Sequence, residues 1–100
     1  MTSNLTSVTI KTEQLPVGVD TDFLLVDLRD PEDYENYHIR EALNFPGVRI
    51  KTDKFIPQLY GYKNKEGKII VLYHFDEKPG IDYATQLFEK GYDNIFLLNA

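Results

Sequence analysis

The chain contains no cysteine. This absence excludes disulfide bonds, thiolate metal sites and catalysis by a cysteine nucleophile. The chain also lacks any apolar stretch near the roughly 20 residues that a transmembrane helix needs. Residues 1–7 lack the basic and apolar regions of a secretory signal. We therefore expect a cytoplasmic protein that does not bind membranes.

Positive charge is scarce as well. The 16 acidic residues outnumber the 11 lysines and arginines, which gives a net charge of −5, and the basic residues are dispersed along the chain. Because nucleic acids and anionic lipids carry negative charge, repulsion disfavours both as partners. A protein partner remains the expectation, and the sequence leaves its identity and the oligomeric state open.

The length of 100 residues, with 42% of them apolar, suits one domain built around a single core. We expect residues 1–7 to form a flexible polar tail and residues 8–100 to form the domain. Two continuous apolar runs predict strands that are buried on both faces, as in a parallel sheet covered by helices. These runs are residues 23–28 and 69–73, and shorter strands are predicted at 8–10, 42–44 and 95–98.

A short helix is predicted after each of the first two strands. The segment 11–15 would form the first of them. For the second, Asp30 is a suitable N-cap and Pro31 suits the first helical position, and the helix would end near Tyr37. The alternation of strands and helices along the chain indicates an α/β fold that winds right-handedly into a parallel sheet.

Two longer helices are predicted in the second half of the chain. One would be capped by Thr52 or Asp53, would place Pro57 in its first turn, and would share its apolar face among Phe55, Ile56, Leu59 and Tyr60. The other would begin near Gly80 and end at Gly91, because glycine tolerates the left-handed conformation that commonly follows a helix.

The six residues between the central strand and the last helix are the candidate site. Ligands of open α/β sheets bind in the crevice at the carboxyl ends of the strands, where loop amides point toward an anion. The segment is a strand-to-helix loop that consists of His74, Phe75, Asp76, Glu77, Lys78 and Pro79.

Four segments resemble the successive signatures of a rhodanese-like domain. They are LVDLRDPEDY at 25–34, HIREALNFP at 38–46, IIVLY at 69–73 and ATQLFEKGYDNIFLL at 84–98. Together they cover nearly the whole chain in the correct order. Within that family, the acid-bearing loop after residues 69–73 most resembles the rhodanese-like domain of centrosomal and ciliary proteins linked to tubulin glutamylation.

This resemblance implies a parallel sheet of about five strands with helices on both faces. It also implies a further turn and helix after the last strand, so that the chain would be a domain truncated at its C-terminus. Active members of the family carry a nucleophilic cysteine directly after the central strand, where this chain has His74. An imidazole cannot replace a thiolate in sulfur transfer. We therefore expect the chain not to be a sulfurtransferase.

The charge of the loop departs from the family pattern too. Active relatives hold an anionic persulfide among loop amides and basic residues, whereas here Asp76 and Glu77 face a single Lys78. A carboxylate near a helix N-terminus is favourable. We therefore expect Asp76 or Glu77 to accept hydrogen bonds from the backbone N–H groups of residues 77–82, which would leave no open anion pocket.

Three residues near the same edge resemble structural residues of the family. Asp27 and Arg29 follow the second strand and would form a hydrogen-bonded pair that ties loops together. His38 would be a structural histidine before a short strand. Five tyrosines are expected to serve core and rim packing, namely Tyr34, Tyr37, Tyr60, Tyr62 and Tyr73.

Two functional hypotheses follow. The first is a catalytically inactive rhodanese-like domain that acts as a protein-interaction or regulatory module, without cofactor or metal, in a centrosomal or ciliary protein. The second is an enzyme of altered chemistry that uses the same loop. Its catalyst would be His74 as a general base or phosphorylated residue, or a divalent metal held by His74, Asp76 and Glu77, which would make it a histidine- or metal-dependent hydrolase.

Overall fold

A parallel sheet carries the fold of the computed structural model, which describes residues 9–10 and 21–98. Its five strands lie in the order β1-β5-β4-β2-β3, and every neighbouring pair is parallel. The prediction of a parallel sheet of about five strands is therefore confirmed. The strands are β1 Thr9–Ile10, β2 Asp22–Asp27, β3 Leu43–Asn44, β4 Lys68–Tyr73 and β5 Ile95–Leu98.

Strand β4 is the central strand, as its continuous apolar run predicts. It pairs with β2 along its whole length and with β5 on its other side. Ile70 and Leu72 are fully buried in the main core cluster. Ile69 and Val71, which alternate with them and point to the other face, are buried as well. Both faces of β4 are therefore covered.

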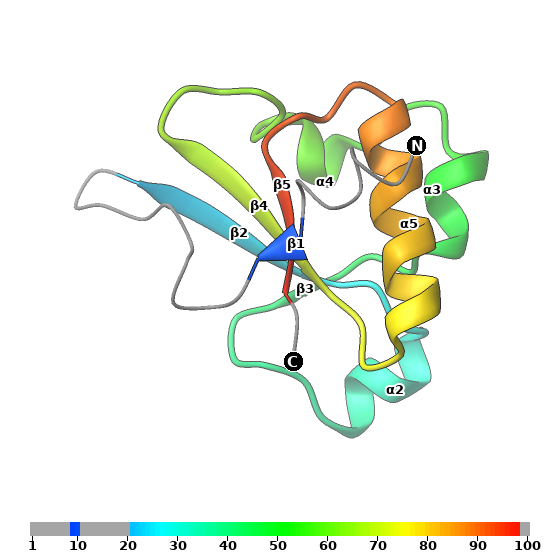
Figure 1. The fold of residues 1–100 in the computed structure, drawn as a ribbon. Helices are drawn as coiled ribbons and strands as arrows, with labels where there is room; N and C mark the ends of the chain where they lie inside the picture. The colour runs from blue at the N-terminus through cyan, green and yellow to red at the C-terminus, as the bar shows by residue number, and fades with distance from the viewer. Residues whose placement is uncertain (1–8, 11–20, 99–100) are drawn as a thin grey trace.

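The helices of the described part of the chain pack against this sheet. Figure 1 shows α3, α4 and α5 on one side of it, and Ala84 and Leu87 of α5 share the core cluster with Ile70 and Leu72. The helices are α2 Pro31–Asn36, α3 Val48–Thr52, α4 Pro57–Tyr60 and α5 Glu77–Glu89. The short helix predicted at 11–15 lies outside the described residues. None of these helices has the length and apolar character that crossing a membrane requires.

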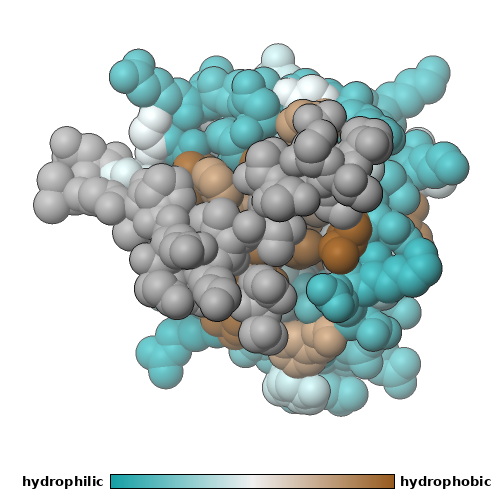
Figure 2. All heavy atoms as spheres, in the orientation of Figure 1, coloured by the Kyte–Doolittle hydropathy of each residue, from teal (hydrophilic) through white to brown (hydrophobic). Residues whose placement is uncertain are grey.

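Hydropathy follows the same layout on the face drawn in Figure 2. Hydrophilic residues occupy most of the periphery, and hydrophobic residues gather nearer the centre. The largest fully buried side chains include Phe45, Ile50 and Leu59, which come from β3, α3 and α4 or the residues next to them. The short connecting elements therefore contribute to the core together with the long strands.

The helix predicted after Thr52 or Asp53 is wrong in its bounds. Two short helices replace it, α3 before residue 53 and α4 beginning at Pro57. A residue that precedes proline is displaced from the helical region, and Ile56 has φ −118° and ψ 89°. The apolar residues do not share one buried face either. Ile56 and Leu59 are buried, whereas Phe55 and Tyr60 are more than half exposed.

The start of the last helix is also corrected. Helix α5 begins at Glu77, not near Gly80, and the Gly80 N–H donates to the Asp76 carbonyl at 3.1 Å. Pro79 does not prevent this, because the first-turn N–H groups of a helix have no partner inside it. The loop therefore has three residues, 74–76, rather than six. The helix ends as predicted, and Gly91 has a φ of 97°.

Candidate functional site

Parallel pairing builds the candidate site at the carboxyl edge of the sheet. Asp27, the last residue of β2, lies beside Tyr73, the last residue of β4. The segments that leave these two strands therefore start side by side, although they are more than 40 residues apart in the sequence. One segment brings Arg29 to this edge, and the other brings the loop 74–76.

Asp27 and Arg29 form the hydrogen-bonded pair that the sequence suggests. The Arg29 Nη2 group donates to Asp27 Oδ2 at 2.8 Å, and the Arg29 Nε group donates to Asp27 Oδ1 at 3.1 Å. The Arg29 backbone N–H donates to Oδ1 as well, at 2.9 Å. Asp27 is 0% exposed and Arg29 is 5% exposed. Burial makes the loss of one partner costly, because the other charge would be left without compensation.

Tyr73 couples this ion pair to the connection that follows α2. Its hydroxyl donates to Asp27 Oδ2 at 2.7 Å and accepts from the Ile39 N–H at 3.1 Å. Burial opposes the ionisation of Asp27, but the hydrogen bonds from Arg29 and Tyr73 outweigh it, so the pKa of Asp27 lies below its ordinary value. Burial and the bond to Asp27 raise the pKa of Tyr73 to about 12.

Two exposed aromatic rings cover the outer side of Arg29. Its guanidinium carbon lies 4.2 Å from the centre of the Phe75 ring and 5.2 Å from that of Tyr37. These two rings stack on each other at 5.7 Å and 27°, and Arg29 Nη2 also donates to the Tyr37 carbonyl at 2.6 Å. Cation–π contacts of this kind favour a fixed geometry. Phe75 and Tyr37 nevertheless remain 57% and 63% exposed.

His74 stands directly after β4, and its ring turns back onto the loop. The Asp76 N–H donates to His74 Nδ1 at 2.9 Å, which fixes Nδ1 as an acceptor. The expectation that Asp76 or Glu77 caps the helix is wrong, because Asp76 is the N-cap residue and makes no side-chain capping bond. A loop N–H, that of Asp76, instead donates its hydrogen bond to the His74 ring. Lys78 is turned along α5 and pairs with Asp82 at 3.2 Å.

His38 is attached to α2 rather than to the Asp27–Arg29 pair. Its ring stacks on Tyr34 with 3.7 Å between the ring centres, and its Nδ1 atom lies 2.7 Å from the Tyr34 carbonyl. The Tyr34 hydroxyl donates in turn to the Ala42 carbonyl. These contacts connect α2 to the chain just before β3. His38 is exposed, and from this position it contacts only Tyr34 among the interactions described above.

The hydrolase hypothesis assigns a metal ion or a general base to this loop. No group of three His, Asp or Glu side chains in the described part of the chain is placed to hold a metal ion. His74, Asp76 and Glu77 are close in sequence but do not converge, because Glu77 already belongs to the helix. As a base, His74 has no free ring nitrogen in this arrangement, since Nδ1 accepts the Asp76 N–H and a neutral imidazole then carries its proton on Nε2.

Sequence reasoning underestimated two tyrosines at this site. Tyr37 and Tyr73 are expected to serve packing only, yet Tyr73 bonds the buried carboxylate and Tyr37 stacks over Arg29. Asn44 was also missed, and its Nδ2 group donates to the carbonyls of Asp27 and Arg29. A polar residue inside the short strand β3 was the one available signal, because such a residue needs a bonding partner when it is partly buried.

The geometry and the sequence place the chain in a known class. The sequence pattern of the rhodanese-like domain matches residues 12–100, and the chain belongs to the rhodanese-like domain family. It is 38% identical over 82 residues to the Centrosomal protein of 41 kDa of Xenopus tropicalis, and 37% identical to that of Homo sapiens. In both cases the match covers 80% of this chain and 22% of the relative. The chain thus spans about a fifth of their length.

Solved structures agree on the fold. Protein hp1203 of Helicobacter pylori superimposes with a TM-score of 0.67 at 24% identity, over 94% of this chain and 78% of that protein. A rhodanese-like domain from Anabaena sp. superimposes with a TM-score of 0.63 at 18% identity, over 88% of this chain and 76% of that chain. At these identities the likeness concerns the architecture alone.

Proposed function

We propose that this chain is a catalytically inactive rhodanese-like domain that acts as a protein-interaction module, and that its contact surface is the aromatic rim formed by Tyr37, Ile39 and Phe75. The inactivity rests on the absence of cysteine and on His74 at the position after β4. The module would work in the cytoplasm as part of a centrosomal or ciliary protein, which the similarity to the Centrosomal protein of 41 kDa supports.

The observation that carries the proposal is a rigid apolar surface in an exposed place. Tyr37, Ile39 and Phe75 are 63%, 39% and 57% exposed. The buried Asp27–Arg29 pair lies beneath them, and Tyr73 holds the Ile39 backbone from below. Aromatic side chains that are already ordered lose little entropy on binding, and exposed apolar clusters of this kind mark interaction sites.

The loop favours this role over chemistry. In the proposed module, Phe75 takes the place above Arg29 and blocks the guanidinium from an incoming anion. Asp76 and Glu77 add negative charge beside it, and Lys78 is paired with Asp82. A hydrolase would need a free base or a metal at this loop, and His74 Nδ1 already accepts the Asp76 N–H.

The experiment compares recruitment of the tagged protein to the centrosome in cells. We expect the double variant Tyr37→Ala and Phe75→Ala to lose most of the centrosomal signal at equal expression. Phe23→Ala is the matched control, because Phe23 is an aromatic residue that is 48% exposed at the start of β2, away from the rim. Full recruitment of the double variant, or equal loss in the control, would contradict the proposed surface.

A further inference from the structure

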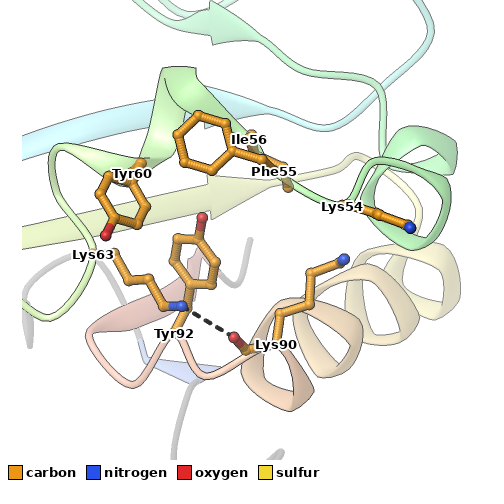
Figure 3. Close-up of a pocket in the computed structure, with 7 residues that line it drawn as sticks. All are labelled: Lys54, Phe55, Ile56, Tyr60, Lys63, Lys90 and Tyr92. Atoms are coloured by element: carbon orange, nitrogen blue, oxygen red, sulfur yellow. Dashed lines mark hydrogen bonds between the residues drawn. The ribbon is translucent and has the colours of Figure 1, made fainter.

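A second site lies at the opposite edge of the sheet from the aromatic rim. A cavity of about 120 Å³ opens there between the end of α5 and the segment around α4. Figure 3 shows that its lining combines ammonium groups with aromatic rings. The lining residues are Lys54, Phe55, Ile56, Tyr60, Lys63, Lys90 and Tyr92. We refer to this cavity as the lysine pocket.

The end of α5 positions one wall of the lysine pocket. The Gly91 N–H donates to the Phe88 carbonyl at 2.9 Å, and the Tyr92 N–H donates to the Leu87 carbonyl at 3.2 Å. These two bonds form a Schellman motif, in which the residue after the left-handed glycine folds back on the last turns of the helix. The motif turns Tyr92 inward, and its ring is buried in the core cluster.

The hydroxyl of Tyr92 faces the lysine pocket. The residue is only 4% exposed, and Figure 3 shows its hydroxyl directed into the group of lining side chains. Within the part of the chain that the structure describes, this hydroxyl has no hydrogen-bond partner, yet it is not sealed from solvent. In a tyrosine that is this deeply buried, the hydroxyl ordinarily bonds another group of the protein. The arrangement therefore leaves one oriented donor available inside the lysine pocket.

Three lysines add positive charge to the lining of the lysine pocket. The Lys63 ammonium donates to the Lys90 carbonyl at 3.2 Å, and the Lys90 ammonium donates to the Asp53 carbonyl at 2.9 Å. Each ammonium has three donors, so each retains two. Among the described residues, none of the three lysines, Lys54, Lys63 and Lys90, pairs with a carboxylate. The nearby Asp53 carboxylate is taken by Arg49 at 2.9 Å.

We propose that the lysine pocket binds a phosphate monoester group. Such a group carries a charge of about −1.5 to −2 at pH 7 and three acceptor oxygens, which suits three ammonium groups and a hydroxyl better than a carboxylate with two oxygens does. The Phe55 and Tyr60 rings lie 5.1 Å apart and are both more than half exposed. They offer apolar contact to the organic body of the ester.

The test is a titration of the whole chain, followed by amide chemical shifts, with phenyl phosphate, inorganic phosphate and benzoate. Phenyl phosphate is expected to bind about tenfold more tightly than benzoate, because it offers more charge and one more acceptor oxygen. Inorganic phosphate is expected to fall between them, since it lacks the ring. The shifts should cluster at Lys54, Lys63, Lys90 and Tyr92. Equal binding of benzoate and phenyl phosphate would overturn the choice of phosphate.

Two variants test the residues themselves. Tyr92→Phe removes only the unbonded hydroxyl, so the fold is retained, and binding of phenyl phosphate is expected to weaken at least about fivefold. Lys54→Gln removes an exposed lysine of the lysine pocket and is expected to weaken binding by about threefold or more. Lys65→Gln is the control, because Lys65 is an exposed lysine outside the lysine pocket. Unchanged binding by Tyr92→Phe, or equal loss in the control, would overturn the proposal.

A further binding measurement distinguishes two sources of the phosphate ester. Free O-phosphoserine represents a small molecule, and a short phosphoserine peptide without other acidic residues represents a modified protein. A peptide that binds at least about tenfold more tightly identifies a phosphoprotein, and equal affinities identify a small phosphate ester. If neither binds, the proposal fails. This inference does not depend on the aromatic rim, and its failure leaves the proposed function unchanged.

Discussion

The hydroxyl of Tyr73 is expected to be the most important single polar atom for the stability of the rim. The substitution Tyr73→Phe keeps the ring in its buried place and removes the donor to Asp27 Oδ2 at 2.7 Å and the acceptor of the Ile39 N–H at 3.1 Å. Asp27 is fully buried, so no water replaces the lost bond. The carboxylate would then depend on Arg29 alone.

The expected loss is about 2–3 kcal/mol in the free energy of unfolding at pH 7. A hydrogen bond to a charged group contributes about 1.5–3 kcal/mol, and the Ile39 N–H adds little because Ile39 is 39% exposed and can bond water. The rise in the pKa of Tyr73 from 10.0 to about 12 corresponds to about 3 kcal/mol. Burial causes the largest part of that rise, so this value is an upper bound.

The pH dependence reports on the ionisation of the Tyr73 hydroxyl. The pKa of Tyr73 is raised in the folded state, so its contribution is complete below about pH 10 and is lost as the pH rises toward about 12. The difference in stability between the wild type and Tyr73→Phe should therefore shrink across that range. The pKa of Asp27 is lowered, so its contribution is present above about pH 4 and disappears as the pH falls further.

The assay is urea denaturation followed by circular dichroism at pH 7 and between pH 9 and 11.5. Tyr62→Phe is the matched control, because its hydroxyl bonds the Asp22 carboxylate at 3.0 Å and that side chain is 54% exposed. We expect the control to lose less than about 1 kcal/mol. If Tyr73→Phe loses no more than the control, or if its deficit is the same at pH 7 and pH 11.5, the coupling between Tyr73 and Asp27 is not what stabilises the rim.

Two further predictions concern the loop and a tight helix contact. The chain should form no thiocyanate from thiosulfate and cyanide, and His74→Cys should restore little of this activity, because Asp76 and Glu77 disfavour a neighbouring thiolate; efficient turnover by that variant would refute this. Gly47→Ala should destabilise the fold by about 1–3 kcal/mol, since its Cβ would meet the Tyr83 ring at 2.1 Å. Gly61→Ala, with no atom within 4 Å of the added carbon, should be close to neutral in the same denaturation assay.

Much of the sheet follows from local composition. A short, continuous apolar run rich in β-branched residues, such as 69–73, favours a strand buried on both faces, and the structure places it at the centre of the sheet. The left-handed Gly91 could also be predicted, because few residues other than glycine adopt that conformation easily. The absence of cysteine and the presence of His74 after the central strand are likewise readable without a structure.

The bounds of the helices were less predictable, because weak signals compete there. Pro57 begins α4 and, by displacing Ile56, separates it from α3, although the apolar residues around it fit one longer helix. At the start of α5, Pro79 marks the first turn of the helix and not the end of the loop. A proline is compatible with both positions, so its presence alone does not decide between them.

The sequence by itself determined the fold class, the order of the elements and the absence of a cysteine. Only the tertiary structure decided which polar groups meet. Asp27 and Tyr73 are hydrogen-bonded although they are 46 residues apart in the sequence. The lysine pocket likewise brings together residues between 54 and 92. Such pairs depend on strand register and on how helices pack, which are set by contacts distant in the sequence. No local pattern encodes them.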